Sequence, residues 1–199
     1  NLKQNHVMNA LSDFEFAYNL KPHLKHIHNT IIDLKIQLGH FSETIVMLKK
    51  LLEHDPNNEQ HYFNIGLCNN SLQNLDDAIS AYTRACELNP RRAETHQNLG
   101  ISQNLKGDTE AAIKSYKRTL ELETDLAEPY CKIGTSLVEE GDITGAKKSF
   151  EKAEIIAPNS LAVLSSLASL YYKQGHYKRA LEYYTRCDTR RCRTMVLEC

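Results

Sequence analysis

The chain has 199 residues, enough for one ordinary domain or for one continuous repeat array. With 41% hydrophobic and 25% charged residues, its composition is that of a folded protein and argues against disorder. The formal net charge of −1 argues against nucleic-acid binding through a general basic field, and no apolar run approaches the roughly 18 residues of a membrane-spanning helix.

Apolar residues recur with helical periodicity in stretches of about 14 residues, two in every 34 residues. Eight glycines and five prolines, about half of the usual share, favour such long helices over a loop-rich β-protein. In chain order the sequence predicts helices at residues 7–20, 25–38, 41–53, 59–72, 75–88, 93–106, 109–122, 127–140, 143–156, 161–174 and 177–190.

The residues that end helices mark the same 34-residue period. Glycine takes the left-handed conformation that closes the first helix of each pair, and one column holds Gly39, Gly107, Gly141 and Gly175, with Gln73 in the empty slot. An aspartate follows two of these glycines and is expected to cap the second helix, at Asp108 and Asp142. The second helix cannot continue through the proline column, which holds Pro22, Pro56, Pro90 and Pro158, with Thr124 at the missed position.

Three further columns predict how the helices pack. A residue without bulk in the first helix lets the second helix approach closely, at Gly66, Gly100, Gly134 and Ala168. The second helix carries a small residue for the same purpose, at Ala10, Ala78, Ala112, Ala146 and Ala180, with Thr44 as the exception. Four residues later an aromatic side chain is expected to fill the space between successive pairs, at Phe14, Tyr82, Tyr116, Phe150 and Tyr184, with Leu48 as the exception.

With these columns the sequence strongly resembles the tetratricopeptide repeat family. One repeat that shows the family pattern reads Tyr130, Ile133, Gly134, Gly141, Ala146, Phe150, Ala153 and Pro158. The resemblance implies an all-α fold, a right-handed α-solenoid superhelix of antiparallel helix pairs with about 5.5 repeats. It covers essentially the whole chain but is nearly silent on function, because the matching residues are structural.

The repeat frame divides what we expect to be one continuous solenoid domain. The expected parts are a partial repeat at 1–24 (the end of a first helix plus a complete second helix), repeat 1 at 25–58, repeat 2 at 59–92, repeat 3 at 93–126, repeat 4 at 127–160, repeat 5 at 161–194, and the start of a further helix or a tail at 195–199. Repeat 1 departs most from the pattern, with Ile32, Thr44 and Leu51 in place of small residues, so looser or shifted packing is expected there. No polar capping helix is visible, which indicates a segment of a longer solenoid; alternatively the ends pack against a partner or a second copy.

The residues that could carry chemistry form no recognisable catalytic or metal-binding motif. The six cysteines include no Cys-x-x-Cys pair, and we expect them to be reduced thiols of an intracellular, cytoplasmic protein. His28 and His96 stand in a column that normally holds a bulky packing residue. A basic tail indicates either a patch for nucleic acid or an acidic partner, or a solvated helix end, at Arg186, Arg190, Arg191 and Arg193. The sequence therefore predicts no enzyme activity, no cofactor and no metal.

The resemblance implies that the first helix of each repeat lines a concave inner groove, and this groove is rich in amides here. An asparagine side chain offers donors and an acceptor, which match a peptide group. Asn64 and Asn98 lie one repeat apart and are expected to hold an extended peptide backbone, unless asparagine simply tolerates a half-exposed helix face. The candidate peptide-binding residues are Asn29, Phe63, Asn64, Leu67, Gln97, Asn98, Ile101, Asn104 and Lys132.

The expected function is that of a non-catalytic scaffold, outside the membrane, that binds a partner protein or an extended peptide in this groove. Some relatives bind chaperone C termini through a carboxylate clamp, but Asp33 and Glu94 stand at clamp positions here and would repel a carboxylate. Two alternatives stay open. The chain is then either the substrate-selecting arm of a larger enzyme, such as a glycosyltransferase, or a self-associating array whose uncapped ends stack.

Overall fold

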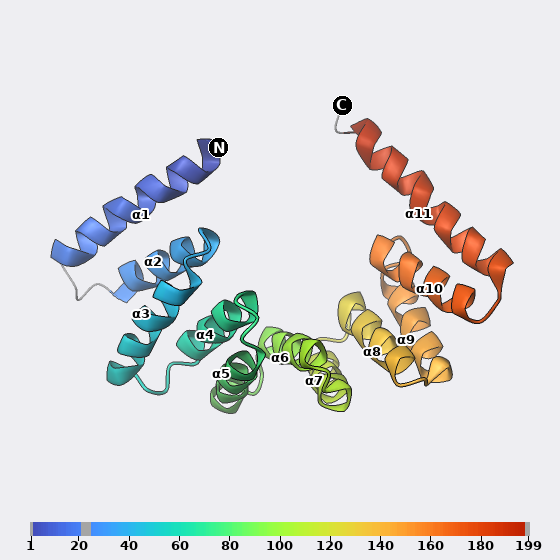
Figure 1. Ribbon diagram of the computed structural model, residues 1–199, viewed down its shortest axis with the longest axis horizontal. Helices are drawn as coiled ribbons and strands as arrows, with labels where there is room; N and C mark the ends of the chain where they lie inside the picture. The colour runs from blue at the N-terminus through green and yellow to red at the C-terminus, as the bar shows by residue number, and fades with distance from the viewer. Residues whose placement is uncertain (1, 21–24, 198–199) are drawn as a thin grey trace. The chain divides into compact units, whose positions relative to one another are not determined.

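The computed structural model describes the backbone of residues 2–20 and 25–197 and the side chains of residues 6–17 and 27–187. Over these residues the chain is helical throughout and contains no strand (Figure 1). It consists of two compact units, residues 1–90 and 91–199, and each is described by itself. The prediction of an all-α chain is therefore confirmed for the part that the structure describes.

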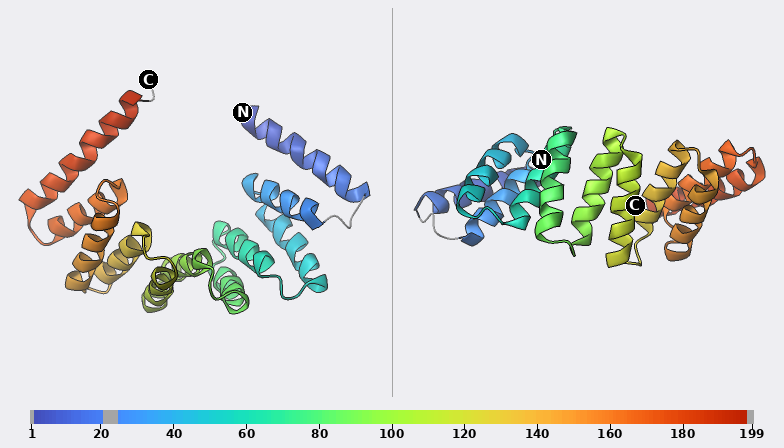
Figure 2. Two further views of the ribbon diagram at one scale, coloured as in Figure 1. Left: turned by 180° about the vertical axis from the view of Figure 1, so that it is seen from behind. Right: turned by 90° about the horizontal axis from the view of Figure 1, so that it is seen from below.

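Each unit is built from consecutive helices joined by short turns. Unit 1 contains α1 (Leu2–Leu20), α2 (Lys25–Gln37), α3 (Phe41–His54), α4 (Glu59–Ser71) and α5 (Leu75–Leu88). Unit 2 contains α6 (Ala93–Lys106), α7 (Thr109–Leu122), α8 (Ala127–Glu139), α9 (Ile143–Ile156), α10 (Leu161–Lys173) and α11 (Tyr177–Leu197). The antiparallel partners lie side by side in every view, α4 with α5, α6 with α7, α8 with α9 and α10 with α11 (Figures 1 and 2).

The turn between the two helices of a pair has the left-handed residue that the sequence predicts. At Gly107 φ is 90°, and the backbone N–H groups of Gly107 and Asp108 donate to carbonyls of the last turn of α6 at 3.0 and 2.9 Å. This arrangement satisfies carbonyls that would otherwise lack a partner at the helix end. The same column is left-handed at Gly39, Gly141, Gly175 and the non-glycine residue Gln73, whose φ is 61°.

The aspartates after these turns cap the second helices, as predicted. The Asp108 carboxylate accepts a hydrogen bond from the Ala111 N–H at 3.3 Å, and the Asp142 carboxylate accepts one from the Gly145 N–H at 2.9 Å. Each bond satisfies one of the free N–H groups of a helix start and places negative charge at the positive end of the helix dipole.

Glycines in the first helices let the aromatic side chains of the second helices lie directly on their backbone. A β-carbon built on Gly134 would lie 2.5 Å from the Phe150 ring, and one on Gly66 would lie 2.5 Å from the Tyr82 ring. Phe150 also shares a buried cluster with Leu167 of the next pair, so the ring joins its own repeat to the following one. The small column beside these rings is fully buried, at Ala78, Ala112, Ala146 and Ala180.

The first helix pair of the repeat frame packs differently, as its sequence predicts. Ile32 and Leu48 are completely buried in a cluster with Ile65. Ile32 stands at the glycine position and Leu48 at the aromatic position of the other pairs, so a larger residue of the first helix meets a smaller residue of the second. Thr44 replaces the alanine of the small column and donates its hydroxyl proton to the His40 carbonyl at 2.8 Å. The contact of α2 with α3 is accordingly less extensive than that of α4 with α5.

At both ends the helices run further than expected. The sequence predicts the end of one helix before residue 6 and the start of another at residue 195, but α1 is continuous from Leu2 and α11 is continuous to Leu197. The repeat frame explains both differences. The turn glycine would fall on Asn5 and the proline on Cys192, and neither residue breaks a helix.

Candidate functional site

The predicted groove residues of unit 1 lie on α2 and α4, the first helices of their pairs. The surface that the first helices of a unit form is called its first-helix face. Asn29 is exposed and Leu67 is half-buried. Asn64 is 6% exposed and accepts a hydrogen bond from the Gln60 Nε2 at 3.0 Å, so part of its capacity is used within α4. Phe63 is only 3% exposed and its ring meets that of Tyr82 edge-on at 5.8 Å. Phe63 is therefore packed mainly in the core of unit 1.

The predicted residues of unit 2 divide in the same way. Gln97, Asn98 and Ile101 of α6 are half-buried, and the Asn98 Nδ2 donates to the Glu94 carbonyl at 3.0 Å, which leaves the side-chain oxygen of Asn98 open to a ligand. Asn104 instead accepts a hydrogen bond from the Ser136 Oγ at 2.8 Å and so ties α6 to α8. The Asn104 side chain therefore takes part in the contact between two first helices.

A hollow of about 230 Å³ opens on the first-helix face of unit 2, between α8 and α10. Its apolar walls are Val138, Leu170 and the Phe150 ring, which comes from α9. Hydroxyl groups and one ammonium group surround them, from Thr135, Ser165, Ser166, Ser169 and Lys173. Lys132, the remaining residue predicted for the groove, is half-buried on α8.

Three of the four hydroxyls of the hollow are oriented by their own helices, whereas that of Ser169 lies 3.4 Å from the Tyr184 hydroxyl. The Thr135 hydroxyl donates to the Cys131 carbonyl at 3.0 Å, and those of Ser165 and Ser166 donate to the Ala162 carbonyl at 3.0 and 2.8 Å. Each proton is thus engaged, and the oxygen lone pairs remain as acceptors. The rim therefore suits the N–H groups of an extended peptide backbone.

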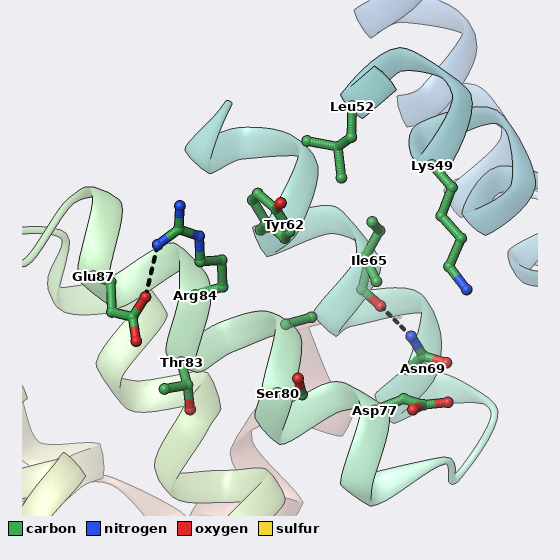
Figure 3. A pocket seen from close by; sticks show the side chains of 11 residues that line it. Lys49, Leu52, Tyr62, Ile65, Asn69, Asp77, Ser80, Thr83, Arg84 and Glu87 are labelled. Atoms are coloured by element: carbon green, nitrogen blue, oxygen red, sulfur yellow. Dashed lines mark hydrogen bonds and ion pairs between the residues drawn. The ribbon is translucent and has the colours of Figure 1, made fainter. Parts of the chain in front are cut away.

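A second kind of hollow lies where one pair of helices meets the second helix of the preceding pair, and Figure 3 shows it in unit 1. This cleft of about 590 Å³ is lined by α3, α4 and α5. The Arg84 guanidinium lies 6.0 Å from the centre of the Tyr62 ring and pairs with Glu87 at 2.8 Å. Its charge is therefore engaged by an aromatic face and by a carboxylate of its own helix.

Buried thiols and one buried imidazole give no sign of covalent chemistry. Burial raises the pKa of the Cys68, Cys86 and Cys131 thiols to about 11, so they stay protonated and weakly nucleophilic near neutral pH. Burial also lowers the pKa of His61, whose Nδ1 has no hydrogen-bond partner among the described residues. The structure describes the side chains of four cysteines, and all four are free thiols, as predicted: Cys68, Cys86, Cys131 and Cys187. Cys192 and Cys199 lie outside the described side chains, as do Arg190, Arg191 and Arg193 of the basic tail.

Among the side chains that the structure describes, no group of three or more His, Cys, Asp or Glu residues is placed to hold a metal ion. No helix in the described ranges combines the length and apolarity that crossing a membrane requires.

The repeat period and its turns agree with comparisons to protein-family models. Models described as tetratricopeptide repeat match residues 30–93, 72–127 and 137–186. The chain belongs to the tetratricopeptide repeat family. A sequence search of curated proteins returned no match.

Solved structures of other tetratricopeptide repeat (TPR) proteins share the fold. The crystal structure of MamA is 26% identical and has a TM-score of 0.77, over 83% of this chain and 96% of that one. MamA from Desulfovibrio magneticus RS-1 is 15% identical, with a TM-score of 0.76 over 82% and 93% of the two chains. YrrB, a TPR protein with an unusual peptide-binding site, is 17% identical, with a TM-score of 0.71 over 87% and 90%.

Within this TPR frame, sequence reasoning missed the hydroxyl-lined hollow of α8 and α10. The prediction favoured amides, because an amide matches a peptide group most obviously. A usable signal was nevertheless present in the spacing of Ser165, Ser166 and Ser169, which places three small polar residues on one helix face beside an apolar residue. Small residues there leave the volume that a bulkier column would fill.

Proposed function

We propose that the chain is a non-catalytic protein-interaction module that binds an extended peptide on the first-helix face of unit 2. The observation that carries the proposal is the hollow between α8 and α10, with its apolar walls and its ring of hydroxyl oxygens. Membership of the TPR family and the peptide-binding site of the structurally similar YrrB support it.

The proposed peptide makes three kinds of contact. The oxygens of Thr135, Ser165 and Ser166 accept hydrogen bonds from backbone N–H groups of the peptide. Val138 and Leu170, with the Phe150 ring between them, shelter one apolar side chain. The half-buried residues Gln97, Asn98, Ile101 and Lys132 extend the face along α6 and α8. Because most polar contacts reach the backbone, sequence selectivity is modest and the expected affinity is micromolar.

The corresponding face of unit 1 belongs to the same proposal in a reduced form. Asn29, Asn64 and Leu67 offer two amides and one apolar side chain there, whereas Phe63 is withdrawn into the core. Binding at this face is expected to be weaker, because Asn64 is nearly buried and already engaged by Gln60.

The test begins with peptides selected against the purified chain from a random display library. Calorimetric titration then compares wild type with Ser165→Arg, which fills the rim of the hollow. The matched control is Ser71→Arg, because Ser71 is also exposed and also donates its hydroxyl to a carbonyl of its own helix, at 3.0 Å. Ser165→Arg should abolish binding and Ser71→Arg should leave it unchanged. Equal affinities for all three proteins would refute the site.

A single side-chain truncation grades the contribution of the predicted amides. Asn98→Ala removes one open acceptor and should weaken binding about twofold to tenfold, the equivalent of about 0.5–1.5 kcal/mol. Light scattering over a concentration series separates this function from self-association, which would raise the apparent mass without any peptide.

A further inference from the structure

Clefts of one construction recur along the chain where a helix pair meets the preceding second helix. In unit 1 one lies between α3, α4 and α5, and in unit 2 one of about 370 Å³ lies between α7, α8 and α9. The lining residues correspond two repeat periods apart in sequence. Lys49 matches Lys117, Tyr62 matches Tyr130, Ile65 matches Ile133, Ser80 matches Lys148, and Arg84 matches Lys152.

The two clefts differ in how their charges are balanced. In unit 1 the lining includes the carboxylates of Asp77 and Glu87, and Glu87 pairs with Arg84 at 2.8 Å. A further cleft of unit 1, between α1, α2 and α3, is balanced as well, because Lys35 pairs with Glu15 at 2.9 Å and with Glu43 at 3.0 Å.

In the cleft of unit 2, carboxylates do not balance the positive charges of the lining. Three exposed lysines line the cleft, Lys117 from α7 and Lys148 and Lys152 from α9, and none forms an ion pair with a described residue. The single carboxylate of the lining, Glu121, pairs with Arg118 at 2.7 Å. Lys152 lies 5.5 Å from the centre of the Tyr130 ring, which holds its ammonium group at the edge of the cleft.

We propose that the cleft of α7, α8 and α9 docks an acidic, extended segment of a partner protein. Carboxylates of the segment pair with Lys117, Lys148 and Lys152, and an apolar side chain between them packs on the floor formed by Leu120 and Ile133. The charge of the cleft selects an anionic ligand, and its apolar floor selects a peptide over a phosphate backbone. This surface shares no lining residue with the hollow of α8 and α10, so it stands independently of the function proposed above.

The probe is a dye-labelled peptide that alternates pairs of acidic residues with leucine, followed by fluorescence anisotropy. Its controls are the same peptide with the acids replaced by their amides and the same peptide with leucine replaced by serine. The acidic leucine peptide should bind best, and its affinity should fall steeply when salt rises from about 50 to 300 mM, because the lysines are exposed and screened. Absence of binding to wild type, or equal binding of the amide peptide, would overturn the proposal.

Matched variants place the site. Lys117→Gln with Lys152→Gln should weaken binding of the acidic peptide at least tenfold, whereas Lys49→Gln with Arg84→Gln, the corresponding pair in unit 1, should change it less than twofold. The circular dichroism spectra of both should match wild type, because the three lysine side chains are exposed and Arg84 is only half-buried. Equal losses in both variants would show a diffuse field instead of a site. If a single-stranded oligonucleotide bound more tightly than the acidic peptide, the occupant would be a nucleic acid and the proposal would be wrong. If the chain formed dimers without peptide, and Lys117→Gln with Lys152→Gln made them monomeric, the occupant would be a second copy and the proposal would also be wrong.

Discussion

Replacing Gly134 by alanine adds one methyl group where the Phe150 ring of α9 lies on the backbone of α8. The new β-carbon would lie 2.5, 2.7 and 2.8 Å from three carbons of the Phe150 ring, whereas carbon atoms in contact are normally about 3.5–4.0 Å apart. The ring must therefore move by about 1 Å. Phe150 is 2% exposed and packs in a cluster that includes Ala146, Ala153 and Leu167, so the ring can move only by disturbing these neighbours or by entering the hollow between α8 and α10.

Two opposing contributions set the change in the free energy of unfolding that Gly134→Ala causes. Overpacking of a filled core costs about 1–3 kcal/mol, and the three contacts of the new β-carbon below 3.0 Å place this site in the upper part of that range. Alanine recovers about 1 kcal/mol relative to glycine within a helix. The free energy of unfolding should therefore fall by about 1–2 kcal/mol, although the loss is expected to centre on unit 2, because repeats mainly contact their neighbours.

Urea unfolding followed by circular dichroism measures the effect, and hydrogen exchange locates it in α8 and α9. The control is the same change in a Phe150→Leu background, where the shorter side chain leaves room for the methyl group. Gly134→Ala should be close to neutral or stabilising there, with a coupling energy of about 1 kcal/mol or more. Unchanged stability in the wild-type background, or an equal loss in both backgrounds, would refute the packing argument.

Three further predictions test the turn, the buried imidazole and the thiols. Gln73→Gly should raise the free energy of unfolding by up to about 1 kcal/mol, because it relieves a side chain held at φ 61°, and a lower urea midpoint would contradict this. Burial lowers the pKa of His61, so the unfolded chain binds the proton more tightly than the folded chain, and the free energy of unfolding should fall as the pH drops below about 6.5. His61→Gln should reduce this fall. Identical pH profiles for wild type and His61→Gln would argue against a role of His61. Cys68 and Cys131, whose pKa burial raises to about 11, should react slowly with a thiol reagent at pH 8 in the native chain and readily in urea, whereas immediate native labelling would show that they are accessible.

The turns and the helix contacts could be predicted from the sequence because each depends on one residue type at one repeat position. The turn at residue 107 has a left-handed backbone, which favours glycine. Asp108 caps the helix start that directly follows it, so its role depends on local sequence alone. Gly134 is explained by a ring 16 positions later in the same repeat, which the 34-residue period aligns. The ends of α1 and α11 were missed because a helix continues by default where its breaking residue is absent.

The candidate site was harder to predict because it depends on which part of a helix face neighbouring helices cover. Phe63 and Asn104 stand in columns that a helical wheel assigns to a groove, yet Tyr82 covers the first and Ser136 engages the second. The lysine cleft draws on three helices, and its excess charge arises because Glu121 is already paired with Arg118. The Arg118–Glu121 pair spans only three positions, but which carboxylates and lysines line one cleft depends on how the three helices pack.

The central claim is that an extended peptide lies on the first-helix face of unit 2, between α8 and α10. Hydrogen exchange measured by mass spectrometry, with and without a saturating selected peptide, tests it most directly. Added protection should be concentrated in residues 127–139 and 161–173, and Ser165→Arg should remove it. Protection confined to unit 1 or to the cleft of α7 and α9, or protection that survives Ser165→Arg, would contradict the claim.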